Sequence, residues 1–159
     1  MTVGSVRREG DIWIIEITPE DGTVKTASFR KVPIHEHLIE MGFLDFIKSV
    51  GDGPLFYDEE ARRTTNEEIT KPPKPPSVLV RDKLGEWVRK DVKVTDPAIR
   101  PNHAWRHTFK RIAARAGMEP RFRDAFCGHE SGKVGDLYET PTLEDMAEEL
   151  KKFPRYVLD

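Results

Sequence analysis

Residues 103–138 read HAWRHTFKRIAARAGMEPRFRDAFCGHESGKVGDLY, and this stretch holds the most informative residue pattern of the chain. His103 and Arg106 stand three positions apart, a Gly-His pair ends at His129, and Tyr138 follows. Because residues three apart lie on one face of a helix, His103 and Arg106 can reach one ligand together. A fixed arginine favours a carboxylate or a phosphate, which its planar fork binds through two parallel hydrogen bonds. Two histidines, an arginine and a tyrosine hydroxyl converging on one phosphate would suit phosphoryl transfer with tyrosine as the nucleophile.

The segments around this pattern predict mainly helices. Apolar residues at helical spacing predict a helix from about residue 103 to Ala116, stopped by Gly117, and Pro120 opens a shorter helix to about Phe126. A short helix or turn is expected at Ser131–Glu139. Thr142 has the position of an N-cap, with Asp145 three residues later, for a final helix to about Phe153.

The central part of the chain predicts a loop between further helices. Residues 35–50 favour two short helices separated at Gly42. Residues 58–77 are polar and end in KPPKPPS, which indicates a flexible loop. Residues 78–90 predict an amphipathic helix, with Leu84, Trp87 and Val88 facing inward, and Trp105 is also expected in the core.

The first 34 residues predict a small antiparallel sheet. Strands are expected at Asp11–Thr18, from Thr23 to Thr26 and at Arg30–Ile34, with residues 1–10 as a polar lead-in. Pro33 indicates that the third strand is an edge strand or ends there. The expected fold is therefore α+β, mainly helical with a three-stranded antiparallel sheet. We expect a single domain over residues 1–159, with its tail helix within residues 141–159.

The charge of the chain is unevenly distributed. The 159 residues include 26 Lys or Arg and 28 Asp or Glu, a net charge of −2. Arg81 to Arg123 nevertheless contain 12 of the basic residues and five of the acidic ones. This segment could form a basic face for nucleic acid, although a solvated charged surface explains the same counts. Cys127 is the only cysteine, so no internal disulfide can form, and no apolar run reaches membrane-spanning length. We expect a cytoplasmic protein.

The ordered motifs resemble the C-terminal half of the catalytic domain of the tyrosine recombinases, the phage-integrase family. The pattern of that family in this region is His-x-x-Arg, then Gly followed by His or Trp, then a nucleophilic Tyr. Here His103-Ala-Trp-Arg106 precedes Gly128-His129 and Tyr138 at the separations typical of the family. A lone His-x-x-Arg would carry almost no information, whereas the ordered set is specific.

The resemblance extends upstream and covers most of the chain. Lys25-Thr26 followed by Arg30-Lys-Val-Pro-Ile34 resembles the pair of strands that carries the catalytic lysine of the family. It is weakest at residues 58–77.

The resemblance implies a role for five residues in cutting and rejoining DNA. Tyr138 would attack the scissile phosphodiester and form a 3′-phosphotyrosyl bond, leaving a free 5′-hydroxyl; rejoining then needs no ATP because the bond energy is conserved. Arg106 and His129 would bind the phosphate oxygens, His103 would act in proton transfer, and Lys25 would protonate the leaving 5′-oxygen. The cations are side chains, so we expect no metal and no cofactor. The implied partners are double-stranded DNA and, in the synaptic complex, a homotetramer.

One departure from the family concerns a further catalytic arginine. The family carries it on a helix before the first strand, whereas Arg7 and Arg8 lie in a short polar segment here. We therefore expect a fragment that starts after this element and is inactive by itself, rather than one in which Arg7 or Arg8 takes the place of that arginine. This leaves two readings open: an integrase catalytic domain, or a DNA-binding and assembly module of the same fold that does not cleave. A metal-dependent nuclease is a third, weaker alternative.

Each candidate residue also has a purely structural explanation. Tyr138 could be a surface tyrosine, His103 a residue near a helix N-cap, and His129 a turn residue. Arg106 could pair with a carboxylate such as Asp124. A lysine at a hairpin tip is usually solvated, which applies to Lys25. The tail helix could pack within its own chain or on a neighbouring protomer.

Overall fold

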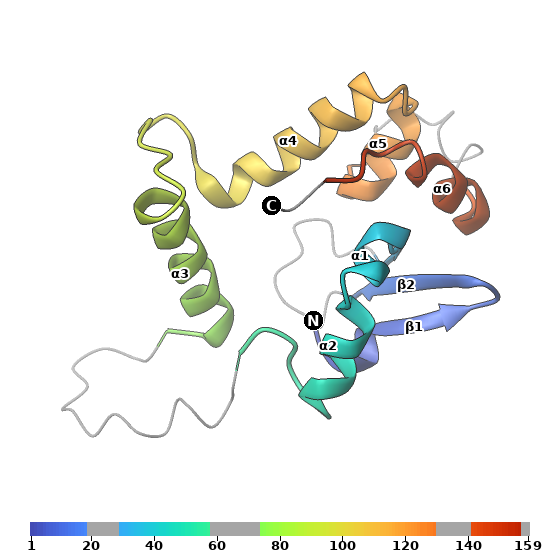
Figure 1. The fold of residues 1–159 in the computed structure, drawn as a ribbon, viewed down its shortest axis with the longest axis horizontal. Helices are drawn as coiled ribbons and strands as arrows, with labels where there is room; N and C mark the ends of the chain where they lie inside the picture. The colour runs from blue at the N-terminus through green and yellow to red at the C-terminus, as the bar shows by residue number, and fades with distance from the viewer. Residues whose placement is uncertain (19–28, 58–73, 130–140, 157–159) are drawn as a thin grey trace.

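The computed structural model describes residues 1–18, 29–57, 74–129 and 141–156. These residues form a mixed α+β fold with one small antiparallel sheet, which confirms the expected class (Figure 1). The predicted elements at Thr23–Thr26 and Ser131–Glu139 lie outside the described residues, as does most of the predicted loop. In the described part of the chain no helix combines the length and apolar character needed to cross a membrane.

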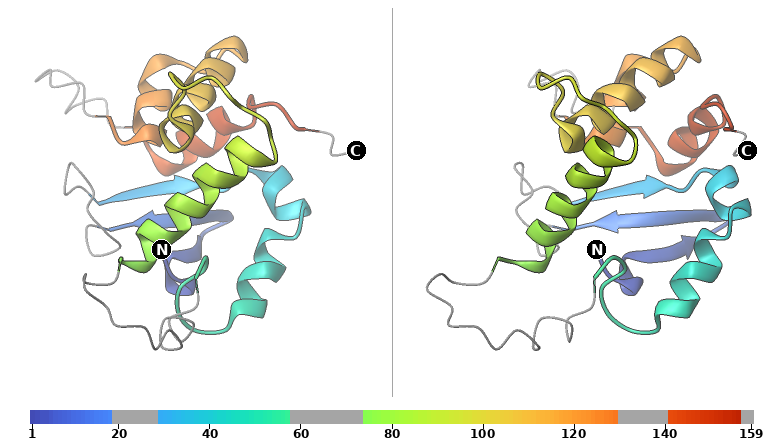
Figure 2. Two further views of the ribbon diagram at one scale, coloured as in Figure 1. Left: turned by 90° about the vertical axis from the view of Figure 1, so that its left-hand side faces the viewer. Right: turned by 60° about the vertical axis from the view of Figure 1, so that its left-hand side comes forward.

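The sheet has the strand order β1-β2-β3, with both pairs antiparallel (Figure 2). β2 (Ile12–Ile17) and β3 (Arg30–Pro33) correspond to two predicted strands, and β3 is an edge strand that ends at Pro33 as expected. β1 (Val6–Glu9) was not predicted, and the expectation of a polar lead-in is wrong there. Its sequence VRRE lacks the apolar alternation that predicts a strand. Main-chain pairing with β2 holds it instead, across a turn at Gly10, where φ is +57°.

Two short helices follow the sheet at the predicted places. α1 (Glu36–Glu40) and α2 (Phe43–Val50) are separated at Gly42, whose φ of +90° suits glycine. A 3-10 turn, η1 (Val3–Ser5), lies at the start of the chain. The segment over residues 35–50 thus matches its prediction at the level of elements.

The core lies between the C-terminal helices and β3. α4 (Pro101–Arg115), α5 (Pro120–Cys127) and α6 (Leu143–Leu150) enclose the main buried cluster, and Val32 of β3 packs against it. Figure 2 shows β3 as the strand nearest to these helices. The buried members are Ala113, Met118, Phe122, Phe126, Met146 and Leu150. This cluster fixes the position of α5, and hence of Gly128 and His129 directly after it.

The tail helix packs within its own chain in this structure. Thr142 caps α6 by accepting a hydrogen bond from the Asp145 N–H at 3.1 Å, as predicted. α6 ends at Leu150 rather than at Phe153. Glu149 accepts a hydrogen bond from the Glu119 N–H at 2.9 Å and so joins α6 to the start of α5.

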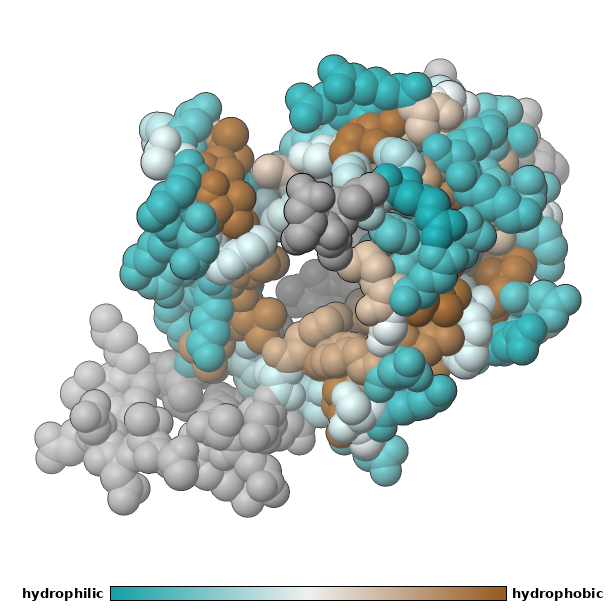
Figure 3. Space-filling view, viewed as in Figure 1, coloured by the Kyte–Doolittle hydropathy of each residue, from teal (hydrophilic) through white to brown (hydrophobic). Residues whose placement is uncertain are grey.

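α3 (Pro76–Lys90) lies to one side of the molecule and meets the start of α4 (Figure 1). It begins two residues earlier than predicted, so Pro76 and Ser77 belong to the helix and not to the loop. The expected core positions are partly wrong: Val88 is buried, but Trp87 is 48% exposed and Leu84 also faces solvent. Trp105 of α4 is 51% exposed, against expectation. Figure 3 shows apolar side chains on the side of α3 that faces the hollow beside it.

Candidate phosphate-binding site

Arg106 extends from α4 to the C-terminal end of α5. Its Nη1 donates a hydrogen bond to the main-chain carbonyl oxygen of Cys127, the last residue of α5. Asp124, the structural partner considered for Arg106, instead accepts a hydrogen bond from Lys110 at 2.5 Å. The Arg106 guanidinium therefore has a main-chain partner and no carboxylate among the described residues.

The Gly128 turn brings His129 to the same place. Gly128 ends α5 in the left-handed conformation, with φ +63° and ψ +40°. The Gly128 N–H donates to the Ala125 carbonyl at 3.0 Å, and the His129 N–H donates to the Asp124 carbonyl at 2.9 Å. These two hydrogen bonds give partners to main-chain carbonyl groups in the last turn of α5. They also fix the main chain of His129, whose ring lies beside Lys110 of α4.

The neighbours of His129 determine which ring nitrogen carries the proton. Its Nδ1 lies 3.1 Å from Lys110 Nζ and 3.7 Å from Asp124 Oδ1. An ammonium only donates, so Nδ1 accepts and the proton of the neutral ring is on Nε2. The longer distance to Asp124 exceeds that of a hydrogen bond. His129 thus keeps an Nε2–H donor for a ligand.

The charges around His129 favour its neutral form. Burial of the ring lowers its pKa below the usual value of 6.5, and the neighbouring Lys110 and Arg106 cations lower the pKa further. Asp124 acts in the opposite direction but does not outweigh them. A neutral imidazole with an Nε2–H can donate to an anionic oxygen without itself being charged.

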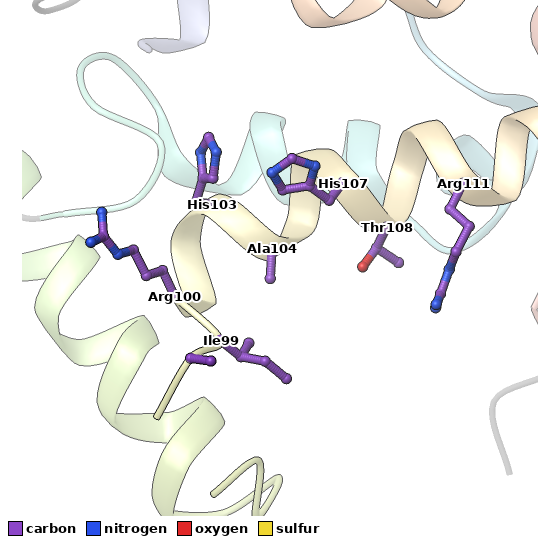
Figure 4. Close-up of a pocket in the computed structure, with 8 residues that line it drawn as sticks. Ile99, Arg100, His103, Ala104, His107, Thr108 and Arg111 are labelled. Atoms are coloured by element: carbon purple, nitrogen blue, oxygen red, sulfur yellow. The ribbon is translucent and has the colours of Figure 1, made fainter. Parts of the chain in front are cut away.

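His103 lies in the first turn of α4, one turn before Arg106, and lines a groove that also contains Arg100 and Arg111 (Figure 4). The groove measures about 440 Å³ and is lined by Ala98, Ile99, Arg100, His103, Ala104, His107, Thr108 and Arg111. The His103 ring meets the His107 ring edge to face, with 4.7 Å between centroids. Among the described residues no hydrogen bond or ion pair joins His103 to Arg106 or His129. Arg106 and His129 lie within electrostatic range of each other at the end of α5. The recorded neighbours of His103 are instead the residues of its groove.

Two candidate residues, Lys25 and Tyr138, lie outside the described residues. Arg7 and Arg8, weighed above as replacements for the further arginine of that family, lie on β1. Arg7 pairs with Glu9 and Glu16, and Arg8 pairs with Asp11. Both arginines are engaged on the edge of the sheet opposite β3, so neither contributes to the Arg106 and His129 site.

Two cations of the site, Arg30 and Lys110, were missed from the sequence. Arg30 begins β3 and lies against Gly128, within electrostatic range of Arg106. Lys110 follows Arg106 by four residues, so helical spacing could have identified it. Arg30 gives no such local signal, because only the packing of β3 against α5 brings it near. The site thus has three cationic side chains and His129 around one described carboxylate, Asp124.

The described residues offer no group of three His, Cys, Asp or Glu side chains placed to hold a metal ion. Comparisons with protein-family models, with curated proteins and with solved structures found no match for this chain. The family resemblance therefore rests on the ordered residues of the sequence. In the structure, α4, the turn after α5 and β3 together form a cationic site that suits an anionic ligand.

Proposed function

We propose that this chain acts on double-stranded DNA as a tyrosine-type site-specific recombinase, cutting and rejoining strands through a 3′-phosphotyrosyl intermediate. The observation that carries this proposal is the convergence of Arg106 and His129, two members of the ordered motif, on one end of α5. A cationic arginine and a neutral imidazole whose Nε2–H has no partner among the described residues are suited to the non-bridging oxygens of a phosphodiester.

The reaction is a balanced exchange of phosphoester bonds. The Tyr138 phenol gives its proton to His103 and its oxygen attacks phosphorus, while the bond from phosphorus to the 5′-oxygen breaks. The leaving oxygen takes a proton from Lys25 and becomes a 5′-hydroxyl. Arg106 and His129 neutralise the charge that grows on the phosphate oxygens. Attack by a 5′-hydroxyl on the phosphotyrosine reverses each step and rejoins a strand.

A second candidate is a DNA-binding and assembly module that does not cleave. The observation that favours it is the engagement of Arg7 and Arg8 in salt bridges on β1, which leaves the position of a further catalytic arginine unfilled by either of them. Such a module would keep the phosphate-binding residues and the fold. It would hold duplex DNA without forming a covalent bond.

A nicked duplex distinguishes the two candidates. Cleavage next to the nick releases a short fragment, so the covalent protein–DNA adduct is trapped and separates on a denaturing gel. A recombinase forms the adduct, Tyr138→Phe abolishes it, and the exposed Tyr156→Phe retains it as the matched control. Duplex binding with no adduct, both from this chain and from the chain mixed with a segment that supplies the further arginine, identifies the non-cleaving module. Cleavage that survives in Tyr138→Phe, or that a chelator abolishes, contradicts the proposal.

A further inference from the structure

Arg30 has no part in the function proposed above, yet its guanidinium packs directly against the turn that carries His129. A Cβ atom placed on Gly128 would lie 2.0 Å from Arg30 Nη1 and 2.8 Å from Arg30 Cζ. The guanidinium thus occupies the space that any larger residue at 128 would need. β3 delivers this side chain to the end of α5, on which Arg106 also converges.

Among the described residues, none forms a recorded hydrogen bond or ion pair with Arg30. Its Nε is buried and makes no hydrogen bond with the described residues. Burial is the main cause that lowers the pKa of Arg30 from its ordinary value, and the nearby Arg106 guanidinium lowers it further. Asp124 is engaged by Lys110. The described residues thus place a buried N–H donor and two neighbouring guanidiniums together without a carboxylate to bridge them. An added anion would be strongly favoured in such an environment.

The end of α5 does not supply that anion by itself. A helix C-terminus carries roughly half a negative charge, which attracts cations only weakly. Arg106 already donates to the Cys127 carbonyl there. Two guanidiniums exceed this partial charge, so positive charge remains. The Gly128 and His129 N–H groups are used within the turn, and hence the side chains are what remain to bind an oxyanion.

We propose that Arg30 is a second phosphate-binding arginine, which holds the same phosphate group as Arg106 beside Gly128. This inference rests on the proposed function, because it takes the ligand to be a phosphate of the DNA backbone. Arg30 would donate from its guanidinium to a non-bridging oxygen on the side of the phosphate facing β3. Arg106 and His129 would approach from α4 and the turn.

The test is NMR of the arginine side-chain Nε–H and histidine ring signals during titration with inorganic phosphate, against chloride at matched ionic strength. We expect the Arg30, Arg106 and His129 signals to shift along one binding curve, while Arg8 on β1 stays unchanged. If Arg106 and His129 shift and Arg30 does not, this inference is wrong and the phosphate site of the proposed function stands. If none of the three shifts, the phosphate site itself fails.

Two substitutions probe the same point. Arg30→Gln should weaken phosphate binding roughly tenfold or more, as expected for a lost charge-assisted hydrogen bond, while Arg8→Gln should bind as the wild type does.

Gly128→Ala keeps every charge but displaces the Arg30 guanidinium, so it should also weaken phosphate binding. Gly10→Ala is its control, because Gly10 has a similar positive φ and open space around its Cβ position. Wild-type affinity in a folded Arg30→Gln would overturn the proposal. Should that variant unfold, the wild-type titration decides.

Discussion

At the scale of single residues, the site contains two residues that the sequence predicted and one arginine that only the folded structure reveals. Arg106 and His129 were predicted from their order in the motif, and the structure brings them to one helix end. The neutral state of His129 could not be predicted, because it depends on Lys110 and on burial. Arg30 comes from a strand far away in the chain. The sequence thus identifies the motif residues of the site. Their protonation states, and the neighbours that come from distant parts of the chain, depend on packing.

The protonation of His129 gives a prediction at this scale. Its lowered pKa means that the folded chain binds fewer protons than the unfolded chain between that pKa and 6.5, so His129 favours folding more as pH rises through this window. Phosphate favours the imidazolium, and by reciprocity its binding should raise the pKa of His129. An NMR titration of the ring with and without phosphate measures this change.

Two variants check the cause of the shift. Lys110→Gln should raise the pKa of His129, because a nearby cation is lost, and Asp124→Asn should lower it further. Nitrogen chemical shifts of the wild type should identify the Nε2–H tautomer. A pKa that rises in Asp124→Asn, or a neutral ring protonated on Nδ1, would be incompatible with the contacts described.

At the scale of elements, the sequence predicted most helices within a few residues but not their exposure. Proline and glycine signals located α4, α5 and the break at Gly42, because these residues act on the local backbone. β1 was missed because main-chain pairing and ion pairs, rather than an apolar pattern, hold it. Trp87 and Trp105 were expected inside because they are large and apolar, but amphipathic spacing does not say whether a neighbouring element covers that face.

The packing of α6 on the core can be measured. Met146 is 6% exposed and belongs to the cluster with Phe122 and Phe126. Met146→Ala should therefore lower the free energy of unfolding by about 2–5 kcal/mol in urea denaturation. Met41, which is 51% exposed, provides the control, and Met41→Ala should change stability by less than about 0.5 kcal/mol. Equal effects of the two substitutions would mean that α6 does not pack within its own chain.

At the scale of the whole molecule, the proposed phosphate site depends on three separate elements meeting at one point. α4 supplies Arg106 and Lys110, the turn after α5 supplies His129, and β3 supplies Arg30. The core cluster between β3 and the three helices holds these elements together. His103 has its own basic groove at the start of α4, so its role in proton transfer stays a prediction. The net charge of −2 does not reveal this cationic site. The basic segment of the sequence indicates part of it, and the folded arrangement adds Arg30 from β3.

The most direct test of the account is a structure of this chain bound to a short DNA duplex. We predict one backbone phosphate with its oxygens at about 3 Å from both the Arg106 guanidinium and His129 Nε2, with the duplex lying along α4. DNA bound to another face, with Arg106 and His129 making no contact with any phosphate, would contradict it.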